Sequence, residues 1–257
     1  MITVISPAKK LMKECKAQTK EYLVPRFLNK SESLINTLKL MKPHDLMTLM
    51  GISEKLAVLN WERIQNWTKK IGPENSLESI YMFRGDTYSG LDADSLNDDD
   101  INFAQDNTRI LSGLYGLLRP LDMMMPYRLE MGTKLKHSSG NNLYDYWGDT
   151  LALSINEDLK KHSDNIIINC ASVEYFKAID RPSLNAKIIT PSFKEIKNGK
   201  MRMVSFHAKR ARGMMTRFII QNKIRDHKDI LSFNLGGYRY EKSISLPFEP
   251  TFVRAQA

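Results

Sequence analysis

Cysteine is scarce in this sequence, which contains only Cys15 and Cys170 among its 257 residues. Two thiols cannot build a disulfide framework in a chain of this length, so a reducing, cytoplasmic location is expected. The five histidines are scattered, and none lies at metal-ligand spacing from another histidine or a cysteine. A Gly-x-Ser-x-Gly elbow, a Walker lysine and a Rossmann glycine triplet are also missing. The sequence therefore predicts no metal, no cofactor and no particular catalytic nucleophile.

Long hydrophobic runs are missing too. The longest nearly uncharged apolar run, residues 165–176, is far shorter than the roughly 20 residues that a membrane span needs. The N-terminus, MITVISPAKK, lacks the basic stretch followed by an apolar segment that marks a secretory signal. No membrane partner is expected, and because no repeat or linker-like segment divides the chain, residues 1–257 are expected to form one large domain.

Positive charge is abundant and unevenly distributed. The net charge is +9, and basic side chains outnumber acidic ones by nine to four in residues 1–50 and by eleven to four in residues 201–257. Residues 51–100 show the reverse, with five basic and ten acidic side chains. Such an excess favours polyanionic partners, provided that the two basic ends of the chain meet in the fold.

Hydrophobic patterning predicts a mixed α/β (α+β) chain. Strands are expected at 2–7, 77–84, 166–169, 187–190 and 201–206. The strand at 166–169 is expected to be fully buried, and the last two strands are expected to be joined by a turn at Asn198-Gly199. Helical periodicity predicts helices at 31–42, 43–50, 54–70, 96–120 and 208–224. These elements interleave along the sequence, which is typical of one α/β or α+β domain.

The stretch LMGISEKLA resembles the turn of a helix–hairpin–helix element spanning about residues 43–60. Such a hairpin binds phosphate because the backbone amides of its turn and the start of its second helix point at the anion. Gly51 permits a tight turn, Ser53 occupies the place of a second glycine, and Lys55 falls in the first turn of the following helix. The alternative is a helical hairpin that only packs against the core.

A second basic feature is the predicted helix containing Lys209, Arg210, Arg212 and Arg217. No acidic residue occurs between 196 and 225, which favours a phosphate-binding helix over an ordinary solvated face of mixed sign. Lys9 and Lys10 follow the first predicted strand, where ligands of open α/β sheets commonly bind.

Polar and aromatic residues are dense in three later segments and suggest a pocket in which a nucleobase stacks on an aromatic ring. The alternatives are a buried arginine–carboxylate network and core aromatics with satisfied polar tips. The candidate pocket residues are Arg119, Asp122, Tyr127, Arg128, Glu130, Tyr144, Trp147, Asp149, Asn169, Ser172, Glu174, Tyr175 and Lys177.

Seven motifs together resemble the YaaA family of bacterial peroxide-stress-resistance proteins, over residues 2 to about 240. The motifs are ISPAKK, LMGISEKLA, FRGDTYSGL, LSGLYGLLRPLDMMMPYRLEMG, LYDYWGD, NCASVEYFK and KRARGMMTRFII. The resemblance implies a cytosolic protein with a distinctive mixed α/β fold, a positively charged cleft and a helix–hairpin–helix element on residues 43–60. It also implies binding to DNA through shape and backbone more than through base sequence.

Three functional hypotheses follow. The first is a DNA-binding protein of the peroxide response that contacts duplex or branched DNA through phosphates and limits iron- and peroxide-driven damage. The second is an enzyme acting on a nucleotide, nucleobase or nucleic acid in the candidate pocket. The third is an iron-sequestering protein, against which the missing ligand spacing argues. The sequence leaves the oligomeric state open.

Overall fold

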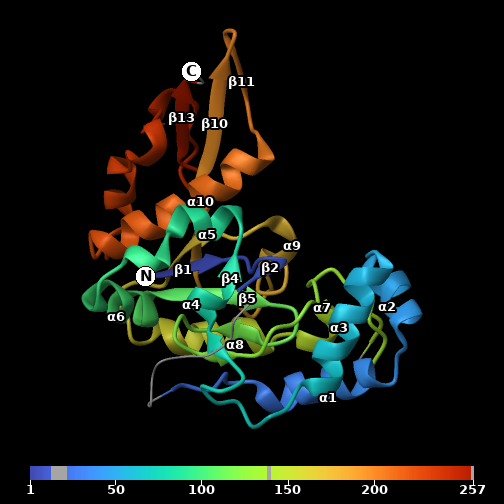
Figure 1. The fold of residues 1–257 in the computed structure, drawn as a ribbon. Coiled ribbons are helices and arrows are strands. Elements are labelled where there is room, and N and C mark those ends of the chain that lie inside the picture. The colour runs from blue at the N-terminus through green and yellow to red at the C-terminus, as the bar shows by residue number, and fades with distance from the viewer. Residues whose placement is uncertain (13–21, 138–139, 256–257) are drawn as a thin grey trace.

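A five-stranded sheet forms the centre of the molecule in the computed structural model, which describes residues 1–12, 22–137 and 140–255. Cys15 therefore lies outside the described residues. The strand order is β6-β5-β1-β8-β9, and only β6 runs antiparallel to its neighbour (Figure 1). The strands are β1 (Ile2–Ile5), β5 (Thr108–Ser112), β6 (Gly116–Leu118), β8 (Ile166–Cys170) and β9 (Lys187–Ile189).

Helices cover both faces of this sheet. The long helix α10 (Ser205–Gln221) lies on one side with α5 (Asp86–Leu91), and α8 (Thr150–Leu159) lies on the other (Figure 1). Every residue of β1, β5 and β8 is accordingly buried. This two-sided burial explains the nearly continuous apolar runs ITVI and IIIN, because a parallel sheet packed on both faces needs no polar alternation.

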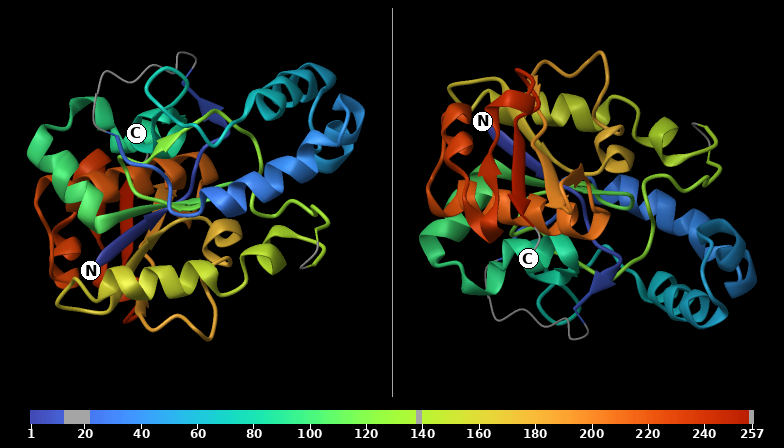
Figure 2. Two further views of the ribbon diagram at one scale, coloured as in Figure 1. Left: turned by 90° about the horizontal axis from the view of Figure 1, so that it is seen from below. Right: turned by 90° about the horizontal axis from the view of Figure 1, so that it is seen from above.

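A second sheet stands beyond α10 and is built mainly from the C-terminal part of the chain. Its strand order is β11-β10-β13-β12, in which β10 and β13 are parallel neighbours (Figure 1). Seen from above, this sheet overlies the central sheet (Figure 2). The strands are β10 (Ser192–Lys197), β11 (Lys200–Arg202), β12 (Arg239–Tyr240) and β13 (Thr251–Ala255).

Three helices project to one side of the sheets: α1 (Leu28–Lys39), α2 (Pro43–Met50) and α3 (Glu54–Asn66) (Figures 1 and 2). Helix α2 is capped by Gly51, whose φ of 60° and ψ of 45° place it in the left-handed region that favours glycine. Ile52 is buried, and Ser53 adopts the extended conformation of an N-cap before α3. The two helices are therefore joined by only three residues.

Short elements complete the fold. They are β2 (Lys10–Leu11), β3 (Leu77–Glu78), α4 (Ser79–Met82), β4 (Phe83–Arg84), η1 (Ala93–Ser95), α6 (Asp98–Asn107), β7 (Met123–Met124), α7 (Leu143–Trp147), α9 (Val173–Phe176), η2 (His227–Ser232), η3 (Leu235–Gly237) and η4 (Lys242–Ile244). Strand β2 pairs with β4, and β3 pairs with β7. None of the helices in the described ranges is long and apolar enough to cross a membrane.

Three predicted elements differ from the structure. The helix expected over 96–120 ends at Asn107, and the leucine-rich remainder forms the buried strands β5 and β6. The strand expected over 77–84 is interrupted by the helical turn α4. The turn at Asn198-Gly199 is present, but it joins β11 to the unpredicted strand β10 and not to the strand expected at 187–190, which forms β9 of the central sheet.

Candidate functional site

A cavity of about 550 Å³ opens where the central parallel strands end. The carboxyl ends of β1 and β8 form its floor, the location at which open α/β sheets generally bind ligands. Nine of its nineteen lining residues are charged. They include the basic residues Lys9, Lys10, Arg84, Arg128, Lys209 and Arg212 and the acidic residues Asp86, Glu130 and Glu174.

Two serines join the strand ends at the floor of the cavity. The Ser172 amide donates to Ser6 Oγ over 2.8 Å, and the two hydroxyls lie 3.3 Å apart. The Tyr88 hydroxyl donates to the Ser6 carbonyl over 3.2 Å and thereby attaches α5 to the same point. Because Ser6 and Ser172 are 166 residues apart, these bonds fix two distant loops in one geometry.

The opposite wall depends on an unusually close helix crossing. Helix α10 packs on α5 at Gly213, where a Cβ atom would lie 1.8 Å from the Thr87 carbonyl oxygen. Gly90 of α5 has the reciprocal role, since its Cβ would lie 2.1 Å from the Arg210 carbonyl oxygen. This glycine-to-backbone contact brings Lys209 and Arg212 of α10 against the cavity beside Asp86 and Thr87 of α5.

Some of the lining charges are paired within the protein. Glu130 accepts from Lys9 Nζ over 2.8 Å and from Arg128 over 3.2 Å. Arg84 forms a two-point pair with Asp94, at 2.7 and 3.3 Å. Lys10, Lys209 and Arg212, in contrast, form no ion pair with any residue that the structure describes. The cavity therefore keeps uncompensated positive charge available to an anion.

Arg212 is the most enclosed of these uncompensated cations. It is half-buried, and this burial lowers the pKa of its guanidinium. Burial likewise raises the pKa of Cys170 to about 12, although a hydrogen bond with Thr216 acts in the other direction. Cys170 is therefore a neutral thiol at physiological pH and serves as an apolar wall beside Arg212 rather than as a nucleophile.

The predicted phosphate-binding residues divide into three places. Four of them, Lys9, Lys10, Lys209 and Arg212, line the cavity, and exposed Arg210 is their neighbour on α10. Gly51, Ser53 and Lys55 lie instead at the tip of the α2–α3 hairpin, which projects to one side of the sheets (Figure 1).

Arg217 has a different environment from the rest of the basic helix. Its guanidinium donates to the carbonyl oxygens of Leu91 and Asp92, at 2.9 and 2.7 Å. These are carbonyls at the C-terminal end of α5, where a cation also interacts favourably with the helix dipole. Arg217 therefore holds α5 against α10 and does not line the cavity.

The predicted pocket residues are gathered only in part. Tyr127, Arg128, Glu130, Ser172, Glu174 and Tyr175 all line the cavity. Tyr144 and Lys177 lie behind this wall, since the Tyr144 hydroxyl donates to the Glu174 carbonyl over 2.9 Å and Lys177 Nζ sits 4.9 Å from the Tyr144 ring centre.

Three further pocket candidates are engaged in packing or loop structure. The buried Trp147 ring donates its Nε1–H to the Gly113 carbonyl over 3.0 Å. Asp149 accepts from the Ser183 hydroxyl over 2.8 Å. Asn169 accepts from the Ala171 amide over 3.0 Å and so shapes the turn that follows β8. None of these three lines the cavity.

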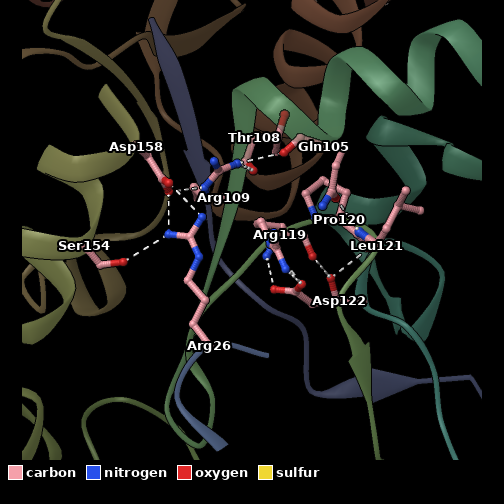
Figure 3. A network of polar contacts seen from close by, with 11 residues as sticks. Arg26, Gln105, Thr108, Arg109, Arg119, Pro120, Leu121, Asp122, Ser154 and Asp158 are labelled. Atoms are coloured by element: carbon pink, nitrogen blue, oxygen red, sulfur yellow. Dashed lines mark hydrogen bonds and ion pairs between the residues drawn. The ribbon is translucent and has the colours of Figure 1, made fainter. Parts of the chain in front are cut away.

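Arg119 and Asp122 lie side by side (Figure 3), and neither lines the large cavity. Strand β6 runs antiparallel to β5, so Arg119 emerges near the amino end of β5 rather than at the carboxyl ends. It binds Asp122 at 2.7 and 3.0 Å and lines a separate cavity of about 210 Å³. In the neighbouring cluster, Asp158 lies between Arg109 and Arg26 (Figure 3).

Several residues of the cavity were not predicted from the sequence. Ser6, Arg84, Asp86 and Thr87 all contribute to it, and the last three belong to the FRGD motif and its following residue. Arg84, Asp86 and Thr87 reach the cavity through the pairing of β2 with β4, and this pairing has no local sequence signal. Within residues 1–12, 22–137 and 140–255, no group of three histidine, cysteine or acidic side chains is placed to hold a metal ion.

Comparison with known proteins gives consistent matches over nearly the full length. A family model described as "Peroxide stress protein YaaA" matches residues 1–244. A UPF0246 protein of Shewanella baltica strain OS155 is 49% identical over 256 residues, covering 100% of both chains. A UPF0246 protein of Shewanella woodyi is 45% identical over 256 residues, again covering 100% of both chains.

Proposed function

Because the chain belongs to the peroxide stress protein YaaA family, we propose that it acts in the peroxide response by binding DNA. The proposed ligand is duplex or structured DNA, held mainly through its phosphates and with little dependence on base sequence. By binding DNA in the cytoplasm, the protein would limit the damage that iron and peroxide cause.

One observation carries the proposal. The two basic ends of the chain converge on one cavity, with Lys9 and Lys10 entering from the N-terminal part and Lys209 and Arg212 from α10. Three of these four, together with neighbouring Arg210, make no ion pair with the described residues. Cations used only for stability or solubility are usually interspersed with acidic partners, whereas phosphate-binding cations remain available.

The α2–α3 hairpin supplies a second proposed contact. Gly51 adopts the left-handed conformation that a tight turn requires, and Lys55 is exposed in the first turn of α3. The first amides of a helix have no intrahelical acceptor and attract an anion. A phosphate at this turn would meet these amides and Lys55, in addition to the phosphates held beside the cavity.

Removing Lys209, Arg210 and Arg212 together, by substitution with alanine, should flatten the salt dependence of duplex binding. Each lost phosphate contact reduces the slope of log K against log salt by about 0.9, so the triple variant should lose about 3 from the slope. Fluorescence-anisotropy titrations of wild type and variant at several salt concentrations measure this directly.

A matched control variant removes three positive charges at positions away from the large cavity. Lys160, Lys161 and Lys228 are exposed cations away from the large cavity, and their triple alanine variant should keep most of the slope. Equal slopes for wild type and the Lys209, Arg210 and Arg212 variant would contradict the assignment to α10. Lys55→Glu, measured separately, tests the hairpin contact in the same assay.

An enzymatic function is the second candidate, and one observation favours it. Six of the residues predicted for a pocket, among them Arg128, Glu130 and Glu174, surround a cavity at the carboxyl ends of parallel strands. Carboxylates beside guanidinium groups are suited to binding and to proton transfer. Turnover of nucleotides or nucleic acid by the purified protein, lost on substitution of these residues, would establish this alternative.

A further inference from the structure

The large cavity has features that binding to duplex backbone does not require. Phosphates on the outside of a duplex are reached by exposed cations such as Arg210, without any enclosed space. Arg212 is half-buried, and burial depresses the pKa of its guanidinium without a compensating carboxylate. Burying a cation without a counter-charge costs hydration free energy. We take this as an indication that an anionic ligand enters the cavity and compensates the charge of Arg212.

Arg128 gives a second, independent indication. Its Nε atom is buried and has no hydrogen-bond partner among the described residues, while its terminal nitrogen lies 3.2 Å from Glu130. Buried polar atoms of this kind are uncommon in folded proteins unless a ligand or water satisfies them. Two enclosed guanidinium groups with unused hydrogen-bonding capacity thus line one cavity.

The size and remaining walls of the cavity limit the class of ligand. A volume of about 550 Å³ lies in the range of small-molecule sites and is far too small for a base-paired duplex. Glu130 and Glu174 supply acceptors for hydroxyl and amino groups, and Pro7, Ala8 and Leu129 supply apolar surface. A bare phosphate needs neither the carboxylates nor the apolar wall.

We propose that this cavity binds one phosphorylated nucleoside. Arg212 and Lys209 hold the phosphate, Arg128 supplies a further donor, and the acidic and apolar walls receive the sugar and base. The same chemistry is presented by a free nucleoside monophosphate and by an unpaired nucleotide everted from a DNA strand. The everted form rests on the DNA-binding function proposed above, whereas the free form does not.

Calorimetric titration of the full chain tests the free ligand. Deoxynucleoside 5′-monophosphates should bind, and the corresponding nucleosides and inorganic phosphate should each bind at least tenfold more weakly. Arg212→Met should weaken nucleotide binding at least tenfold, whereas Arg210→Met, the same change on the same helix outside the cavity, should alter it less than twofold. Equal affinity for inorganic phosphate and nucleotide, or equal loss in both variants, would overturn the assignment.

Lys209→Met provides a second variant that does not depend on a buried side chain. Lys209 lines the cavity but is exposed, so its replacement should leave folding intact and still weaken nucleotide binding severalfold. Circular dichroism and thermal unfolding verify that each variant is folded. If Arg212→Met does not fold, unchanged nucleotide binding by Lys209→Met overturns the proposal.

A duplex with 2-aminopurine in a mismatched pair tests binding of the everted nucleotide. Fluorescence of this base should rise as it leaves the stack and enters the cavity, and Arg212→Met should abolish the rise even at protein concentrations that saturate the duplex by anisotropy. Duplex binding with neither fluorescence change nor free-nucleotide binding would overturn the cavity assignment and leave DNA binding standing. Nucleotide binding without duplex binding would overturn the proposed DNA binding and leave the cavity assignment standing.

Discussion

Gly213→Ala should lower the melting temperature of this protein by roughly 6–12 °C. The added Cβ would lie 1.8 Å from the Thr87 carbonyl oxygen and 2.8 Å from the Leu91 amide nitrogen, both of which are backbone atoms that cannot rotate away. Overpacking costs up to about 3 kcal/mol when the neighbours are rigid, and each kcal/mol shifts the midpoint by about 2–4 °C in a chain of this size. Differential scanning calorimetry measures the change.

Gly72→Ala is the matched control for this substitution. Its Cβ would approach only the carboxylate end of the Glu74 side chain, at 2.6 Å, and this flexible group can move. Its melting temperature should stay within about 2 °C of wild type. Gly213→Ala should also weaken any ligand of the large cavity, because α10 carries Lys209 and Arg212. An unchanged melting temperature would show that the two helices do not cross this closely.

Asp158→Asn should cost about 3 kcal/mol of unfolding free energy or more. Asp158 is 4% exposed and binds Arg109 at 2.6 Å and Arg26 at 2.7 and 2.8 Å (Figure 3). Asparagine keeps the shape but removes the charge, leaving the buried Arg109 guanidinium uncompensated. Breaking a buried pair by removal of one partner typically costs about 3–5 kcal/mol. Urea unfolding at neutral pH gives the difference.

Glu157→Gln on the same helix is the control for Asp158→Asn. Glu157 pairs with Lys160 at 2.8 Å, but both side chains are more than two-thirds exposed. Exposed pairs contribute roughly 0–1 kcal/mol, so this variant should be nearly as stable as wild type. Equal losses for the two variants would contradict the special role assigned to the Asp158 cluster.

The pH dependence of stability provides a second readout for Asp158. Burial acts to raise the pKa of its carboxyl group, but hydrogen bonds from Arg26 and Arg109 outweigh that effect and leave the pKa lowered. The folded state therefore binds this proton more weakly than the unfolded state. The contribution is present above the ordinary aspartate pKa and is lost as the pH falls through the lowered folded value. In urea unfolding at successive acidic pH values, Asp158→Asn should flatten this part of the profile.

The elements that the sequence predicted best are those whose local pattern and tertiary role agree. The apolar runs at 2–7 and 166–169 form β1 and β8, and their parallel arrangement places Lys9 and Ser172 at one edge of the sheet. The helix expected over 208–224 forms as α10 at 205–221. The close crossing of α10 and α5 brings the cations of α10 to the same cavity as Lys9. The only trace of this crossing in the sequence is the pair of glycines at the contact.

The error over residues 96–120 and the misplacement of Arg119 have a common physical origin in the segment from Thr108 to Leu118. Its leucines occur at helical spacings, yet the segment is buried on both faces, where strand and helix patterns are hard to distinguish. The reversal between β5 and β6 then places Arg119 at the amino end of the sheet, away from Arg128. Arg119 and Arg128 are therefore only nine residues apart in the sequence but lie at opposite ends of the sheet.

The order of the central sheet also has a consequence for how the chain assembles. Strand β1 is flanked by β5 and β8, whose first residues are 108 and 166, so neither edge of β1 has a partner until much of the chain has been synthesised. Pairings this distant in sequence close large loops, which makes folding slow. We therefore expect ribosome-bound fragments ending before residue 170 to be protease-sensitive, because the first strand made is among the last to be enclosed.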